Sequence, residues 1–212
     1  TQEEGLAETA EVSDALDHFL IADELYRRGE YDTAIGEFEQ VLQSQPDHFW
    51  AQYLSGLCLL RQNRPTEARI HLTACLAQGR DFVWLYLLRG FANGELLAFE
   101  AADADFRKAL EMSLDDNSRY VLLVNRGVLR IRQLRLDDAI ADLNKAITLK
   151  PTEYQAFVNL AQAYRRQGDL ERAMEQLDLA VANKPTLDQL YRLRARLHVE
   201  RKEPAAAIED FD

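Results

Sequence analysis

Cysteine, glycine and proline are scarce in this chain, with 2, 9 and 5 occurrences among 212 residues. Two cysteines, Cys58 and Cys75, cannot form a disulfide framework and lack the companion ligands of a zinc site, so they favour a reduced, cytoplasmic setting. Few glycines and prolines argue against an all-β or loop-rich protein. Apolar runs such as 121–124 fall far short of the roughly 18 residues of a membrane-spanning helix. The acidic start, Thr1-Gln2-Glu3-Glu4, has no apolar signal core.

Positive charge is also in short supply. The formal net charge is −11 and the sequence pI is about 4.9, which argues against general binding to nucleic acid or to an anionic membrane. The imbalance lies in residues 1–116, with 9 Lys/Arg against 22 Asp/Glu, whereas residues 117–212 have 16 against 14. The chain is therefore acidic at its front and rich in arginine at its back.

An internal repeat is the strongest positive signal. Six alanines recur at spacings of 34, 34, 37, 34 and 34 residues: Ala34, Ala68, Ala102, Ala139, Ala173 and Ala207. Each is taken as position 20 of a unit. Position 8 is then always small: Ala22, Gly56, Gly90, Gly127, Ala161 and Ala195. Position 24 is always large and apolar: Phe38, Leu72, Phe106, Leu143, Leu177 and Phe211. Agreement of independent columns on one register establishes the repeat.

Each unit reads as two short helices joined by a turn. In the fifth unit, the first apolar stripe has the spacing of one helical face: Phe157, Leu160, Ala161 and Tyr164. Gly168 follows as a helix stop, because glycine adopts the left-handed conformation without strain. The second stripe is Leu170, Ala173, Leu177 and Ala180, and Pro185 closes the unit. Small residues at positions 8 and 20 let the two helices of a hairpin approach closely.

This pattern, including the Phe157–Tyr164 stripe, Gly168, Ala173 and Pro185, resembles the tetratricopeptide repeat. The resemblance implies an all-α fold, a right-handed superhelical solenoid of helix-turn-helix hairpins. It predicts an acidic lead-in or cap followed by six repeats in one solenoid domain. These segments are 1–14 for the lead-in, then 15–48, 49–82, 83–119, 120–153, 154–187 and a truncated 188–212. The third is lengthened by an insertion at 115–118, and the last should leave an open, adhesive end.

Candidate chemistry is sparse. His18, His48, His71 and His198 are isolated, and His18 and His198 fall at packing positions, so we interpret them as core residues rather than ligands. The two cysteines stand where small apolar residues belong. No glycine-rich phosphate loop occurs, and acidic pairs such as Asp137-Asp138 suit helix starts. We therefore predict no catalytic residue, no metal and no cofactor, and hence no enzyme activity in these 212 residues.

The resemblance implies that the first helix of each repeat lines a concave groove. An apolar, aromatic part comes first: Trp50, Tyr53, Leu57, Trp84, Leu87, Phe91, Val124 and Val128. A polar and basic part follows: Gln162, Arg165, Arg166, Arg192 and Arg196. Asn125 and Asn159 share position 6, from which an amide can hold a peptide backbone, since it offers both a donor and an acceptor.

These residues predict a non-catalytic module that binds an extended peptide or a helix of a partner protein, with apolar and acidic segments, in the groove. Two alternatives stay open. The repeats can be a self-associating structural spacer, joined through the open C-terminal end. They can also be a regulatory or targeting region of a larger enzyme, because two short stretches around residues 49–53 and 120–127 resemble the repeat tails of large bacterial serine/threonine protein kinases.

Overall fold

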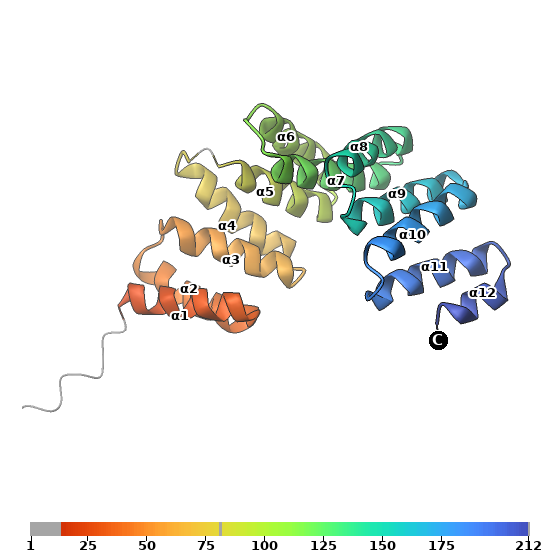
Figure 1. Cartoon of the computed structure of the whole chain (residues 1–212). Coiled ribbons are helices and arrows are strands. Elements are labelled where there is room, and N and C mark those ends of the chain that lie inside the picture. Colours follow the sequence, from red (N-terminus) through yellow and green to blue (C-terminus); the bar gives the residue numbers. More distant parts are fainter. Residues whose placement is uncertain (1–13, 81, 212) are drawn as a thin grey trace, which may run out of the picture. The chain divides into compact units, whose positions relative to one another are not determined.

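The computed structural model describes residues 14–80 and 82–211, and within these ranges it contains helices and no strand (Figure 1). Two compact units are present, Thr1–Ala98 and Phe99–Asp212, and each is described by itself. The first unit has the helices α1 (Ala15–Arg28), α2 (Tyr31–Ser44), α3 (Phe49–Arg61), α4 (Pro65–Ala77) and α5 (Val83–Glu95). The second has α6 (Phe99–Leu110), α7 (Asp116–Arg132), α8 (Leu136–Leu149), α9 (Tyr154–Gln167), α10 (Leu170–Asn183), α11 (Asp188–Glu200) and α12 (Pro204–Glu209).

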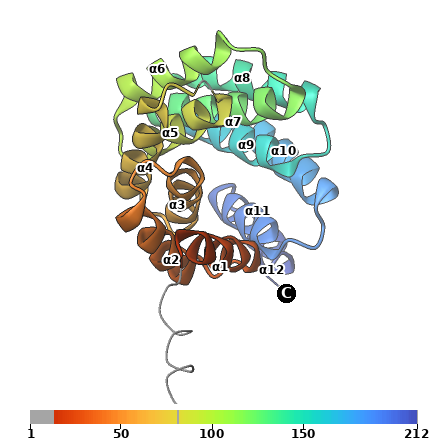
Figure 2. The same cartoon turned by 90° about the vertical axis from the view of Figure 1, so that its left-hand side faces the viewer.

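Consecutive helices pack as hairpins, and the hairpins stack within each unit. In the first unit α1 packs on α2 and α3 on α4, and α2 and α4 also contact the helix that follows them (Figures 1 and 2). In the second unit α7 packs on α8, α9 on α10 and α11 on α12, with the same contact from each second helix to the next first helix. The predicted all-α arrangement of helix-turn-helix hairpins is confirmed.

The predicted repeat boundaries stay a prediction, and the helices lie within them as follows. Four predicted repeats each contain one packed helix pair: 15–48, 49–82, 154–187 and 188–212. Helix α7 begins at Asp116, within the predicted insertion at 115–118 and before the predicted start of the repeat 120–153. The third predicted repeat, 83–119, begins with α5 in the first unit and continues with α6 in the second. Of the predicted lead-in 1–14, only Asp14 is among the described residues, and it precedes α1 without a side-chain cap.

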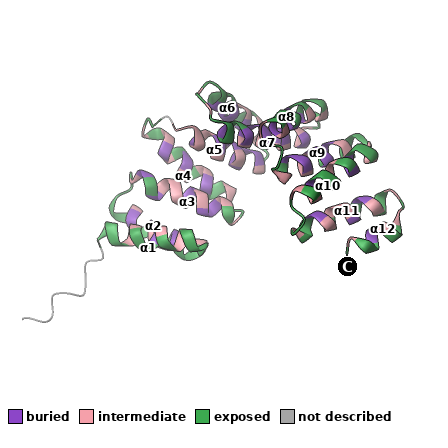
Figure 3. Ribbon diagram, viewed as in Figure 1, coloured by how far each residue is buried: buried purple, intermediate pink, exposed green. Residues whose placement is uncertain are grey.

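The core follows the repeat register, and buried residues lie where helices face one another (Figure 3). The position-20 alanines are 0–3% exposed. A Cβ atom added to Gly127 would lie 2.8 Å from Cγ of Leu143, and one added to Gly56 would lie 3.1 Å from Cγ of Leu72. Position 8 is therefore small because the position-24 side chain of the same hairpin covers it.

The turn inside each hairpin imposes the left-handed conformation at position 15. Gly29 and Gly168 adopt it, as the sequence predicts for Gly168, with φ of 79° and 85°. Four residues that are not glycine adopt it as well: Asn63, Leu97, Leu134 and Lys202, with φ of 57–64°. The turn bonds are alike, since Asp169 N–H donates to Tyr164 O at 3.0 Å and Arg135 N–H donates to Arg130 O at 2.9 Å. The hairpin therefore sets the backbone geometry whichever side chain is present.

A buried ion cluster replaces apolar packing in the hairpin of α7 and α8. The Asp142 side chain is only 2% exposed, and it accepts two hydrogen bonds from Arg126, at 2.6 and 2.8 Å, and one from Arg130. Arg130 occupies the position that Leu25, Leu59 and Tyr164 hold in three other repeats. Two cations and two-pronged geometry compensate the desolvation of the carboxylate.

We predict that Leu134→Gly stabilises the protein. A side chain in the left-handed region costs about 1–2 kcal/mol, part of which glycine returns as greater freedom of the unfolded chain. A net gain of about 0.5–1 kcal/mol is expected, since Leu134 is 70% exposed and loses little packing. Urea denaturation followed by circular dichroism measures it. Gly168→Ala, at the equivalent turn, should lower the midpoint, and a shift of the same sign in both variants contradicts this account.

Candidate functional site

The aromatic residues predicted to form the first half of a groove gather on α3 and α5 of the first unit. Trp50 is 49% exposed, and its ring lies edge-on to Phe49 and Tyr53, with ring centroids 5.2 and 5.8 Å apart. Tyr53 and Leu57 are half-buried, as are Trp84 and Phe91. Packing among the rings holds Trp50 in a fixed orientation while about half of its surface meets solvent.

Leu87 and Val124 differ from the prediction. Leu87 on α5 is fully buried, and Val124 on α7 is 8% exposed, so neither presents an accessible groove surface. Val124 packs in a cluster with Tyr120, Leu123, Ala146 and Ala156. Helices of neighbouring repeats are close enough to cover this register position.

An open depression of about 500 Å³ lies beside Trp50. Residues 45–50, in the turn from α2 and the start of α3, line it together with Arg80. The Arg80 guanidinium lies 4.5 Å from the centroid of the Phe49 ring, a cation–π contact. His48 caps α3 at this edge, because its Nδ1 accepts the Ala51 N–H at 3.1 Å.

A second depression, of about 200 Å³, lies among α9, α10 and α11 of the second unit. Its floor is apolar and its rim is polar. The floor residues are Val158, Ala161, Leu177, Leu193 and Leu197, and the rim residues are Gln162, Arg165 and Arg196. The structure thus brings together three of the residues predicted for the basic half, from two different helices, around one apolar hollow. Arg166 and Arg192 are exposed but do not line it.

The rim arginines differ in their freedom to meet a ligand. Arg165 pairs with Glu200 through bonds of 2.8 and 2.9 Å, which raise the pKa of the guanidinium and lower that of the carboxyl. Arg196, by contrast, has no ion-pair or hydrogen-bond partner among residues 14–80 and 82–211, nor does Arg192. Arg196 is therefore the rim cation that a carboxylate can engage without displacing an internal partner.

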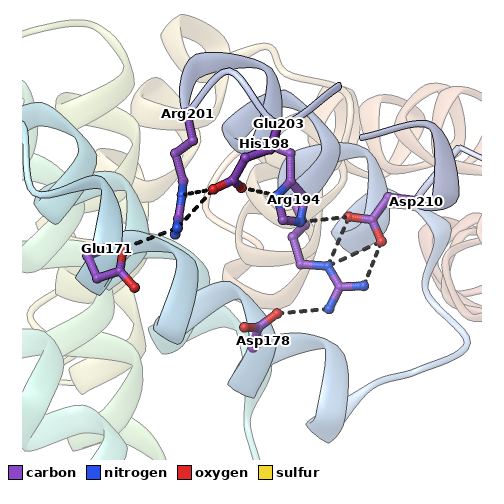
Figure 4. A network of polar contacts seen from close by, with 7 residues as sticks. All are labelled: Glu171, Asp178, Arg194, His198, Arg201, Glu203 and Asp210. Carbon is purple, nitrogen blue, oxygen red and sulfur yellow. Dashed lines mark hydrogen bonds and ion pairs between the residues drawn. The ribbon is translucent and has the colours of Figure 1, made fainter. Parts of the chain in front are cut away.

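Arg194 on α11 and Arg201, which directly follows this helix, make a different set of contacts (Figure 4). Arg194 binds Asp210 at 2.6 Å and Asp178 at 2.8 Å, and Arg201 binds Glu171 at 3.1 Å. These bonds hold α12 and α10 to α11. The side of α11 that carries Arg194 therefore stabilises the packing of α10 and α12, whereas Arg196 on the same helix stays accessible to solvent.

The two asparagines predicted to hold a peptide backbone are half-buried. Asn159 donates from Nδ2 to the Gln155 carbonyl at 2.9 Å within α9. Its second N–H and its amide oxygen are left for a ligand, so the amide can still offer both a donor and an acceptor. Asn125 and Val128 are half-buried on α7, and no bond ties the Asn125 amide.

The tetratricopeptide repeat model matches residues 19–81 and 124–188, which together exceed half of the chain. The chain belongs to the tetratricopeptide repeat family. Among curated proteins it is 26% identical over 171 residues to DnaJ homolog subfamily C member 3 of Gallus gallus, a match that covers 74% of this chain and 33% of that protein. The tetratricopeptide chain thus spans about a third of the length of this relative.

Solved structures share the fold. PilW, described as a type IV pilus biogenesis factor, aligns with a TM-score of 0.77 at 20% identity, over 94% of this chain and 91% of its own. YrrB, described as a tetratricopeptide protein with an unusual peptide-binding site, aligns with a TM-score of 0.60 at 20% identity, over 90% and 92%. Tetratricopeptide repeats are protein-interaction modules, and the identities establish the fold rather than a partner.

Reactive groups in this tetratricopeptide chain are few. Within the described ranges, no three His, Cys, Asp or Glu side chains gather as metal ligands, and no described helix has the length and apolarity to cross a membrane. The interpretation of His18 and His198 as core residues is wrong. Both are half-buried and bind acids, with Nδ1–Oε2 distances of 2.6 Å to Glu37 and 2.8 Å to Glu203. Glu37 and Glu203, each across the hairpin turn from its histidine, are the sequence features that could have indicated these contacts.

We predict that both thiols are inert in the folded protein. Cys58 and Cys75 are fully buried, and burial raises their pKa to about 12 and about 11. Because the thiolate is the reactive form, a disulfide reagent at pH 8 should label neither residue until the chain unfolds. Ellman's assay with and without denaturant checks this. Labelling in the native protein as fast as that of free cysteine contradicts it.

Proposed function

We propose that this chain is a non-catalytic module that holds a segment of a partner protein, with an apolar side chain in the hollow of the second unit and an acidic side chain against Arg196. The observation that carries the proposal is the pairing of an apolar floor with an unpaired arginine at its rim. The partner class follows from these two features together.

The hollow suits one apolar side chain. An apolar cavity of about 150 Å³ accepts a benzene ring, and this hollow measures about 200 Å³. Burying a Leu or Phe side chain contributes about 1.5–3 kcal/mol. Arg196 adds direction, because guanidinium and carboxylate meet through two parallel hydrogen bonds. An aliphatic or aromatic residue next to Asp or Glu is therefore the recognition element that fits.

The aromatic surface of the first unit is a second candidate docking surface. Trp50 is held by its neighbours and half exposed, and such anchored tryptophans contribute more to interfaces than other side chains. Tyr53, Leu57, Trp84 and Phe91 complete this surface. The peptide-binding site named for YrrB supports a peptide as the type of ligand.

Several finer properties belong to the same proposal. A net charge of −11 supports protein partners over nucleic acid or anionic membranes. Two buried thiols suit a cytoplasmic setting.

Ile208 and Phe211 at the last hairpin are 61% and 60% exposed, and they favour self-association at that end as a second role. Attachment to a kinase stays a hypothesis from sequence likeness alone.

We predict that Arg196→Glu weakens the binding of acidic peptides. A library of short peptides carrying Leu or Phe beside Asp or Glu is screened by fluorescence anisotropy, and the best binder is compared among variants. Charge reversal should weaken its affinity by at least tenfold, about 1.4 kcal/mol, because attraction becomes repulsion. Trp84→Ala should weaken peptides that dock on the aromatic surface of the first unit, while the circular dichroism stays helical.

Arg119→Glu is the matched control, since Arg119 is an exposed arginine of the second unit outside the hollow. It should retain affinity within about twofold, as surface charges at a distance are screened. An equal loss in both arginine variants shows general attraction rather than a site. Unchanged affinity in Arg196→Glu refutes the proposed function.

A further inference from the structure

Two register positions of the first helix in each repeat make the contact between stacked hairpins. At positions 3 and 10, five helices carry only small or aliphatic residues. The pairs are Ala51 and Cys58, Leu85 and Ala92, Leu122 and Leu129, Ala156 and Ala163, and Leu190 and Leu197, all 0–2% exposed.

The partners of these residues are side chains of the preceding hairpin. Ala51 and Cys58 share a cluster with Ile35, Phe38 and Val41 of α2. Ala163 packs with Leu143 of α8, and Leu197 packs with Leu177 of α10. A spacing of seven residues places positions 3 and 10 on one helical face. This face is therefore the surface on which the preceding hairpin packs, and we call it the stacking surface.

Helix α1 differs from the other five at positions 3 and 10. Its residues at positions 3 and 10 are Asp17 and Glu24, and both are exposed. Ile21 lies between them and is 47% exposed. Asp17 has no side-chain partner among the residues from 14 onward that the structure describes. Glu24 meets Arg28 only at 3.7 Å, between two side chains that are mostly in solvent. The same face that is apolar and covered in five helices is thus acidic and open in the first.

We propose that Asp17 and Glu24 prevent a repeat hairpin, such as the last hairpin of a second copy, from stacking on this face of α1. Stacking would bury two carboxylates against an apolar second helix, and each buried, unpaired charge costs several kcal/mol. A polar outer face is what a terminal repeat needs to remain soluble. The inference concerns the end of the stack and is independent of the proposed function.

The first test restores the apolar pair in the full chain with Asp17→Leu and Glu24→Ala. The new face should accept the exposed Ile208 and Phe211 end of another copy, giving head-to-tail association. Sedimentation velocity across the micromolar range should then show mass increasing with concentration beyond that of the unmodified chain. The matched control is Asp32→Leu with Glu39→Ala, two exposed acids of α2 that are also seven residues apart.

The second test measures stacking directly. A copy of residues 154–187 is placed immediately before Ala15, where its own connector keeps the repeat register. In the unmodified chain the added hairpin should unfold separately, at lower urea, without raising the main midpoint. In the Asp17→Leu, Glu24→Ala chain it should join the main transition and raise the midpoint. Coupling in the unmodified chain overturns the proposal, and so does an absence of coupling in both chains.

Discussion

Close approach of two helices over a small side chain is the contact on which the rest of the structure depends. Where Gly127 lies against Leu143, a single added methyl group would come within 2.8 Å of Cγ. This approach fixes the crossing of the hairpin and sets the left-handed turn that joins its helices. The turn geometry is so well determined by the packing that leucine and lysine adopt it where glycine would be easier. This buried contact orients the helices and therefore also the exposed side chains on them, including those of the candidate binding surface.

The sequence predicts the fold because that contact repeats. A constraint that acts six times leaves columns of alanine and large apolar residues, and agreement among columns reveals the hairpins without any knowledge of long-range contacts. The left-handed backbone at Leu97, Leu134 and Lys202 does not follow from their residue types, because leucine and lysine rarely adopt it. Only their shared register position with Gly29 and Gly168 indicates it. Arg130 stands where two other repeats carry leucine, and the Asp142 carboxylate that compensates its charge lies twelve residues away on another helix.

The candidate site was harder to predict for a physical reason. The type of a side chain suggests which helical face it occupies, but its solvent exposure depends on which residues of neighbouring helices cover it. Leu87 and Val124 share a register with accessible residues yet are covered. Arg165 and Arg196 look equivalent in sequence, but Glu200 from a later helix engages only the first. The residues of the hollow come from three helices, and no local pattern announces which of them meet around a common floor.

Both tryptophans of the chain, Trp50 and Trp84, lie in the first unit. Intrinsic fluorescence is therefore a local reporter, whereas far-ultraviolet circular dichroism averages over all described helices. Denaturation curves from the two signals coincide only if both units unfold together. In a repeat array, whose stability is a sum of neighbour contacts, the difference between these curves measures how far cooperativity extends along the chain. The natural placement of two indole rings thus provides that measurement without any added label.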